Sequence, residues 1–231
     1  MRAPRFRRIA AALIAIILAG AGAVLGLAGS ASATTSATTP SGDSYGYYVT
    51  GGTYTSSTAD WTMPTLKCGT SGTSLALWTG LDGFTSDSVE QVGAEAYCAG
   101  KTAEYFGWYE LYPVGSEVTF SQTLKPGDSL QASVTYSDSE FTLTLRDVTQ
   151  GWTGTVSKPL AGAKRSSAET IVTAPDALSC SPRLIASFTG DTVDGSALGS
   201  LDPVKVLGGD PDITVSPVSG KTFTVTCAPT A

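Results

Sequence analysis

This chain of 231 residues contains no histidine, which limits the side chains that could carry out catalysis. Ser-His-Asp and Cys-His arrangements and histidine-ligated zinc are therefore excluded. Carboxylates remain as candidate acids and bases, and an ordinary glutamate pKa of about 4.3 makes such a group a competent base in mild acid. If the protein is an enzyme, we expect a carboxylate to carry its acid–base chemistry at acidic pH, with no metal and no cofactor.

Glutamine supplies the only side-chain carboxamides, since the chain also has no asparagine. Gln91 lies in the middle of an expected strand, within WTGLDGFTSDSVEQVGAEAYC at residues 78–98. The other glutamines lie on polar strand faces or at a turn, where a solvated role is expected: Gln122, Gln131 and Gln150. Gln91 is thus the candidate for a hydrogen-bond donor that acid cannot titrate.

Alternation in this stretch places polar and small residues on common strand faces. The expected sets are Trp78, Gly80 and Asp82 on one strand and Gln91, Gly93 and Glu95 on the next. Glycines between polar groups leave room for a substrate backbone to approach. Taken singly, these residues have ordinary structural explanations: a cross-strand glutamine, a core or rim tryptophan, a turn aspartate.

The elements that must position these residues are short alternating segments, separated by Gly, Pro, Asp and Ser from about Tyr45 onward. In SLQASVTY and EFTLTLRD, apolar residues alternate with polar ones, and the pair predicts a hairpin turning at residues 137–139. No apolar period of 3.6 residues is sustained after the N-terminal region. The pattern predicts an all-β sandwich of two packed antiparallel sheets.

The N-terminal region has the pattern of a secretory signal peptide over residues 1–33, with four arginines before an apolar run and Ala-Ser-Ala at the end. A Thr/Ser-rich linker is expected over 34–44 and a single domain over 45–231. The signal peptide takes four of the 14 basic residues and none of the 20 acidic ones, so the secreted form carries a net charge of −10. Nucleic acid and, for the mature form, membrane are therefore not expected partners, and a monomer is the default expectation.

The four cysteines of an exported chain predict two disulfides, for which three connectivities are possible. We favour pairing between sequence neighbours, Cys68 with Cys98 and Cys180 with Cys227. Their spacing lacks the CxxC pairs of a zinc site, so a structural metal is not expected.

Four segments in order resemble the glutamic peptidases, also called eqolisins, whose founding members are fungal acid proteases. They are LWTGLDG (77–83), EQVGAEAY (90–97), GWYELYP (107–113) and SSAETIV (166–172). The text after the third segment is similar to that of bacterial members, and the resemblance extends from about Tyr45 to the C-terminus. It implies a sandwich of two bent antiparallel sheets, a concanavalin/lectin-like jelly roll, whose concave face binds an extended peptide or unfolded protein.

The resemblance also implies a catalytic pair, Gln91 and Glu169. Glu169 would activate a water and later protonate the leaving amine, while the Gln91 amide would donate to the oxyanion. Supporting positions carried over from the family are Trp78 and Asp82, with Trp108 and Glu110 as structural or substrate-lining residues.

Two departures from the family pattern are visible. Thr170 follows the expected catalytic glutamate, where family members usually carry tryptophan, which bears on the shape of the substrate groove. About a dozen residues separate Ala33 from the first expected strand, too few for a substantial propeptide.

Two other functions are compatible with the residues alone. A lectin-like sandwich would use the same aromatic and acidic surface to bind carbohydrate without chemistry. A glycoside hydrolase would use two carboxylates, drawn from Glu90, Glu95, Glu104, Glu110 and Glu169. Peptide cleavage in acid, measured against polysaccharide binding or cleavage, distinguishes the three.

Overall fold

The computed structural model describes residues 38–40, 42–69, 72–174 and 184–228, all of which belong to one compact unit. The predicted signal peptide lies outside the described residues, as do Cys180 and residues 34–37 and 41 of the predicted linker. In the described part of the chain no helix is long and apolar enough to cross a membrane.

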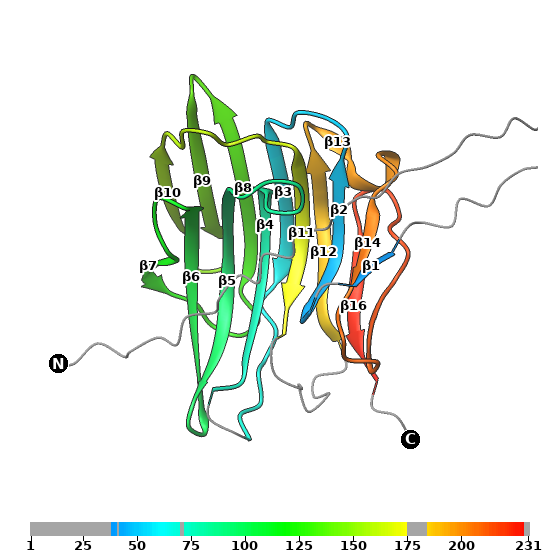
Figure 1. Cartoon of the computed structure of the whole chain (residues 1–231). Helices are drawn as coiled ribbons and strands as arrows, with labels where there is room; N and C mark the ends of the chain where they lie inside the picture. Colours follow the sequence, from blue (N-terminus) through cyan, green and yellow to red (C-terminus); the bar gives the residue numbers. More distant parts are fainter. Residues whose placement is uncertain (1–37, 41, 70–71, 175–183, 229–231) are drawn as a thin grey trace, which may run out of the picture. The chain divides into compact units, whose positions relative to one another are not determined.

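Two sheets form the fold, and they lie as two layers (Figure 1). The first sheet has the order β1-β14-β2-β11-β4-β5-β6-β7. Its strands are β1 (Thr38–Pro40), β14 (Val204–Leu207), β2 (Ser44–Thr50), β11 (Ser167–Thr173), β4 (Ser74–Asp82), β5 (Val89–Ala99), β6 (Thr102–Tyr112) and β7 (Val118–Thr123).

The second sheet has the order β10-β9-β8-β3-β12-β16-β15, and β13 pairs with β12. Its strands are β10 (Trp152–Lys158), β9 (Glu140–Asp147), β8 (Ser129–Ser137), β3 (Ser56–Thr62), β12 (Leu184–Val193), β16 (Phe223–Cys227), β15 (Ile213–Val215) and β13 (Ser196–Ala197). A single 3₁₀ turn, η1 (Leu198–Ser200), follows β13 in the described chain. The predicted sandwich of two antiparallel sheets is confirmed.

One pairing at the sheet edge departs from the antiparallel pattern. β1 pairs with β14 in parallel, with Thr38 opposite Lys205. This short strand falls within the segment predicted to be a linker. Strand pairing uses backbone N–H and C=O groups, so a segment without apolar side chains can still join a sheet edge.

The hairpin predicted from alternation is present as β8 and β9, which pair from Leu130–Asp147 to Ser137–Glu140. Its apolar positions face the core: Leu130, Ala132, Val134, Phe141, Leu143 and Leu145 are buried. The polar residues between them lie on the outer face. Burying one apolar face of each sheet against the other is what holds the two layers together.

The central strands of the first sheet behave differently, because β4, β5 and β11 are buried along nearly their whole length. Residues on both faces of these strands are therefore shielded from solvent. Polar side chains there lose hydration, and their ionisation becomes sensitive to neighbouring charges.

One predicted disulfide, Cys68–Cys98, is confirmed, with Cα atoms 5.5 Å apart. It joins the segment before β4 to the far end of β5, the strand that carries Gln91. The second pairing, Cys180–Cys227, stays a prediction because Cys180 is outside the described residues.

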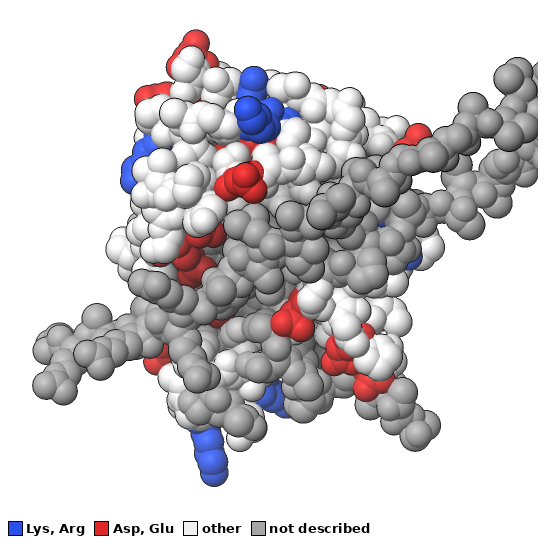
Figure 2. Space-filling view, in the orientation of Figure 1, with Lys and Arg blue, Asp and Glu red and all other residues white. Residues whose placement is uncertain are grey.

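Charged side chains are sparse on the visible face of the molecule (Figure 2). Acidic residues are spread among uncharged ones, and basic residues occupy separate positions on the described part of this face. This distribution agrees with the acidic sequence, whose isoelectric point is about 4.6.

Candidate active site

One row of residues crosses the middle of the first sheet and contains both predicted catalytic residues. Glu169 on β11 pairs with Gly80 on β4, Gly80 pairs with Gln91 on β5, and Gln91 pairs with Glu110 on β6. Residues opposite one another in antiparallel strands project to the same face. Glu169, Gln91 and Glu110 therefore share one face of the sheet, the outer face of the sandwich.

Gly80 keeps the space between Glu169 and Gln91 open. A Cβ atom at this position would lie 3.0 Å from the Glu169 Oε1 atom and 3.0 Å from the Gln91 Cβ atom. Gly83 is also close, since a Cβ there would lie 4.0 Å from the same Oε1 atom. Two strand spacings separate Glu169 from Gln91, roughly 10 Å between backbones, so two side chains can converge above the glycine.

The Gln91 amide is fixed on its other side by Glu110. Gln91 Nε2 donates to Glu110 Oε2 at 2.7 Å. Burial raises the pKa of the Glu110 carboxyl, and the hydrogen bond from Gln91 opposes this rise. An amide nitrogen carries two hydrogens, so one N–H of Gln91 is held by Glu110 while the other is available to a ligand.

Glu169 is 1% exposed, and neither of its carboxyl oxygens is in hydrogen-bonding geometry with a described donor. Burial raises the pKa of this carboxyl well above its usual value, and the charges of Asp82 and Glu90 act in the same direction. The neighbouring Ser167 hydroxyl offsets the rise only in part. A carboxyl in such surroundings binds a proton strongly and releases it at higher pH than a solvated glutamate does.

Asp82 anchors the turn that leads into β11. Its carboxylate accepts backbone N–H groups from Lys164 at 2.9 Å, Arg165 at 2.7 Å and Ser166 at 2.8 Å. Burial alone would raise the pKa of Asp82, but these backbone donors and nearby serine hydroxyls, including Ser88, hold it below its usual value.

Asp82 departs from regular strand geometry. The residue adopts φ of 65° at the end of β4, which breaks the strict alternation. Its carboxylate turns to the backbone of the neighbouring turn, although Trp78 and Gly80 stay on the common outer face.

A second row, next along the strands, carries the two tryptophans. Gly93 on β5 lies between Trp78 on β4 and Trp108 on β6. A Cβ at Gly93 would come within 2.5 Å of the Trp78 Cβ atom, so only glycine fits beside this ring. Trp78 Nε1 donates to Thr173 Oγ1 at 3.0 Å, which ties the indole to β11 on the side of its row away from Glu169.

The sequence of this chain also matches a known protein family. The model of the Peptidase A4 family matches residues 43–194, which include every residue of both rows. The chain belongs to the Peptidase A4 family.

Known members of the family are similar to this chain over different parts of its length. Scytalidopepsin B from Scytalidium lignicola is 37% identical over 91 residues, which are 38% of this chain and 34% of that protein. The alignment therefore spans about a third of this curated relative.

Structural likeness covers more of the chain. Scytalido-glutamic peptidase with a peptide-based transition state analog superposes with a TM-score of 0.66 at 27% identity, over 82% of this chain and 100% of that one. SCP-B, an eqolisin in complex with the tripeptide Ala-Ile-His, gives 0.63 at 25% identity, over 82% and 100%. Aspergilloglutamic peptidase from Aspergillus niger gives 0.56 at 27%, over 67% of this chain and 99% of that chain.

The other candidate carboxylates of this protein, Glu90, Glu95 and Glu104, do not lie beside Glu169 above Gly80. Glu90 pairs with Leu81 on the opposite, core-facing side of the sheet, where burial and the charge of Asp82 raise its pKa to about 9. Glu95 is on the outer face two rows from Gln91, and burial raises its pKa to about 7. Glu104 is exposed near the start of β6. The group facing Glu169 across the glycine is thus an amide, not a second carboxylate.

Some residues of the site had no sequence signal. Tyr48 on β2 pairs with Glu169 on β11, and its ring stacks on Phe84 with ring centroids 4.1 Å apart. This contact joins a strand to a loop 36 positions away in the sequence, so only the tertiary fold reveals it. It places an aromatic wall at the Glu169 end of the row.

Thr170 was expected to alter the substrate groove, but the structure places it elsewhere. The residue is buried and pairs with Thr79, whose side chain faces the second sheet. Adjacent residues on a strand point to opposite faces, so Thr170 lies behind Glu169, inside the sandwich.

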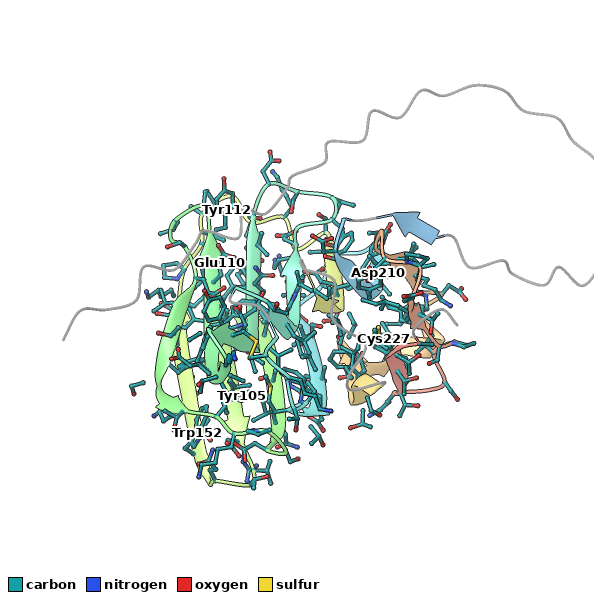
Figure 3. The ribbon with its side chains drawn as sticks, turned by 90° about the horizontal axis from the view of Figure 1, so that it is seen from below. Tyr105, Glu110, Tyr112, Trp152, Asp210 and Cys227 are labelled. Atoms are coloured by element: carbon teal, nitrogen blue, oxygen red, sulfur yellow. A yellow bond between two sulfur atoms is a disulfide. The ribbon has the colours of Figure 1, made fainter. Side chains whose placement is uncertain are left out.

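A separate cavity lies near β14 and β15, lined by Lys205, Leu207, Asp210, Pro211 and Ile213 among others. Asp210 and Glu110 lie in different parts of the sandwich (Figure 3). The cavity contains no residue of either row. We therefore place the candidate active site on the outer face of β11, β4, β5 and β6.

Proposed function

We propose that the protein is a secreted endopeptidase that hydrolyses peptide bonds with Glu169 and Gln91 and a water nucleophile. The observation that carries this proposal is the placement of Glu169 and Gln91 on one face, on either side of Gly80. Membership of the Peptidase A4 family supports the reaction class. Secretion rests on the signal-peptide pattern of residues 1–33.

In the proposed reaction, the Glu169 carboxylate takes a proton from water as the water oxygen attacks the scissile carbonyl carbon. The developing oxyanion accepts the second N–H of the Gln91 amide. Glu110 holds the first N–H and so keeps the amide turned with its nitrogen toward the substrate. Protonated Glu169 then passes its proton to the leaving amine as the C–N bond breaks.

The proposed substrate is an extended peptide or an unfolded protein. Gly80 and Gly93 lower the floor of the outer face at successive rows, and Trp78 and Trp108 border the second of these gaps. A chain without side-chain obstruction below it can bring its backbone close to the sheet. The peptide-like ligands of the two related structures support this choice.

The proposed pH dependence follows from the surroundings of Glu169. Its raised pKa means that acid keeps most of the carboxyl protonated, whereas the general base must be ionised. We therefore expect kcat to rise with pH across the acidic range. A working range in mild acid results if the fold loses stability at higher pH, as the other buried carboxyls predict.

The test is cleavage of an unfolded protein substrate between pH 3 and pH 7, compared with binding and cleavage of polysaccharides. We expect new peptide termini and no polysaccharide product. Chelators and serine- or cysteine-directed reagents should leave the rate unchanged, because water is the nucleophile and no histidine is present. Polysaccharide cleavage without peptide cleavage would overturn the proposal, and strong inhibition by a chelator would overturn its metal-free mechanism.

A further inference from the structure

A β-bulge in the second sheet directs a carboxyl into the core behind the candidate active site. Between Thr189 and Thr192, β12 carries one more residue than its partner β3. Gly190 adopts φ of 64° there, and a Cβ at this position would come within 2.6 Å of an Asp60 carboxyl oxygen. The extra residue shifts the alternation, so that Asp191 faces inward and is fully buried.

Two hydroxyls, those of Thr170 and Thr79, connect this carboxyl with the backbone of Glu169, and a third, that of Ser57, lies beside Thr79. Thr170 Oγ1 lies 3.2 Å from Asp191 Oδ1, and Thr79 Oγ1 lies 3.2 Å from Thr170 Oγ1. Thr79 Oγ1 donates to the Glu169 carbonyl oxygen at 2.9 Å. Ser57, on the second sheet, lies 2.7 Å from Thr79 Oγ1. A continuous chain of hydrogen bonds thus runs from Asp191 to the main chain of Glu169.

Each threonine hydroxyl can donate only one hydrogen bond. The protonation state of Asp191 therefore decides which group donates and which accepts at each step of the chain. If Asp191 is protonated, it can donate to Thr170, Thr170 to Thr79, and Thr79 to the Glu169 carbonyl. If Asp191 is ionised, it can only accept, so Thr170 donates to it and becomes a second possible acceptor for the Thr79 hydroxyl. The single hydrogen of Thr79 is then divided between Thr170 Oγ1, at 3.2 Å, and the Glu169 carbonyl oxygen, at 2.9 Å, while Ser57 Oγ lies 3.5 Å from that carbonyl oxygen.

The surroundings of Asp191 favour the protonated form. Burial and the charge of Asp60 on β3 raise the pKa of Asp191 to about 8, although the hydrogen bond from Thr170 opposes this rise. From the β16 side, Lys221 offers its backbone carbonyl, which accepts the Asp191 N–H at 3.1 Å. On β11, Glu169 projects to the other face of the sheet. The carboxyl oxygen Asp191 Oδ2 has no described hydrogen-bond partner.

We propose that Asp191, in its protonated form, is a positioning residue for Glu169, acting through Thr170 and Thr79 on the Glu169 backbone carbonyl. This inference rests on the proposed role of Glu169 as general base. When Asp191 ionises, Thr170 competes with that carbonyl for the Thr79 hydrogen, and the catalytic carboxyl loses part of its alignment. The strand that carries Glu169 on its outer face is thus positioned from its inner face by a hydrogen-bond chain that depends on the Asp191 proton.

The first test is the pH dependence of kcat for the wild type and for Asp191→Asn. The asparagine amide donates to Thr170 at every pH, so the variant keeps the chain in the active direction. We expect wild-type kcat to fall roughly fivefold as Asp191 ionises, about the effect of one hydrogen bond, with KM unchanged. The variant should lack this fall. Circular dichroism in the same buffers corrects each rate for the folded fraction, which separates positioning from stability.

Thr79 supplies a matched pair of variants. Thr79→Val removes the hydroxyl that donates to the Glu169 carbonyl, and we expect a pH-independent loss of roughly fivefold in kcat. Thr79→Ser keeps the hydroxyl and should restore most of the rate. Equal kcat values for the valine and serine variants, per folded molecule, would overturn the proposal.

A second readout needs no activity. The carbonyl ¹³C chemical shift of Glu169, measured by NMR, reports whether that oxygen accepts a hydrogen bond. We expect it to change in step with the titration of the Asp191 carboxyl carbon, and to stay constant in Asp191→Asn. A carbonyl shift that ignores this titration would overturn the proposal, as would a shift that changes while corrected kcat does not. Absence of all peptide cleavage by the wild type would instead overturn the proposed function and the catalytic half of this inference, while the NMR titration still decides whether the hydrogen-bond chain exists.

Discussion

The outer faces of the two sheets share the same alternating pattern but differ in what their polar residues do. On the second sheet, hydroxyls of β9 and β10 pair across the strands, with Thr142 and Ser157 2.9 Å apart and Thr144 and Thr155 3.2 Å apart. These groups are at least partly exposed to solvent. On the first sheet, the outer polar groups include Glu169, which is buried and ionisable.

Glycine and burial account for the difference. On β9 and β10 of the second sheet, the outer hydroxyls bond to one another. In the first sheet, Gly80 and Gly93 interrupt the rows, and the glutamate beside Gly80 has no described hydrogen-bond partner. Polar groups without partners carry a cost in stability that is often retained where a substrate completes the site.

Among changes that would test this contrast between the sheets, removal of the Gln91 amide should have the largest effect. Gln91→Ala deletes the proposed oxyanion donor, and loss of one such donor typically lowers kcat by about 10²- to 10³-fold. The fold should survive, because Gln91 is only partly buried. The measurement is kcat on an unfolded protein substrate, with circular dichroism as the control. A rate within threefold of wild type would show that Gln91 is not the donor.

Filling the gap between the two side chains should have the next largest effect. Gly80→Ala places a methyl group 3.0 Å from a Glu169 oxygen and 2.9 Å from the Glu90 backbone oxygen, so the glutamate must move. A displacement of about 1 Å can lower kcat roughly 10²-fold.

The matched control for this change is Gly69→Ala, where a Cβ would meet nothing within 4 Å. We expect wild-type activity from that variant. Unchanged kcat in folded Gly80→Ala would contradict the requirement for an open space above this glycine.

The smallest expected effect is on stability, and it depends on pH through the buried carboxyls of both sheets. Glu90, with a pKa of about 9, binds a proton in the folded state at pH values where an unfolded glutamate, at about 4.3, has lost it. The folded form therefore binds more protons between these values. Its stability is greatest below about pH 4 and falls as pH rises toward the folded pKa, a direction shared by Glu95, Glu169 and Asp191.

Thermal unfolding from pH 4 to pH 8 measures this dependence. We expect the unfolding midpoint to fall with pH in the wild type and to fall less in Glu90→Gln. Thr144→Val on the second sheet should leave the pH dependence as it is in the wild type, because it removes no titrating group. A wild-type midpoint that rises across this range would show that the buried carboxyls are ionised in the folded protein.

Much of the fold could be predicted from sequence because it depends on local alternation. The β8–β9 hairpin, the two-sheet architecture and the Cys68–Cys98 disulfide follow from the period of two, the turn residues and cysteine proximity. The shared face of Gly80 and Gln91 also follows from alternation, and the family resemblance supplied Glu169.

The remainder depends on contacts that alternation does not encode. Asp82 adopts φ of 65° and its carboxylate accepts N–H groups from a distant loop, and the bulge at Gly190 turns Asp191 inward. The bulge changes which side of the sheet a side chain occupies, and the turn at Asp82 sets which backbone groups its carboxylate meets. A single glycine or aspartate in the sequence does not indicate such a change, because the same residues occur in ordinary turns.

The central claim, that Glu169 is the general base of a peptidase, is tested most directly by Glu169→Gln. The substitution keeps the shape of the side chain and removes the group that accepts the proton, and the variant should remain folded because the raised pKa of the wild-type carboxyl keeps most of it protonated in acid, with only the ionised fraction acting as base. We predict that its kcat on an unfolded protein substrate at mildly acidic pH falls by several orders of magnitude. Cleavage by folded Glu169→Gln at a rate near that of the wild type would contradict the account.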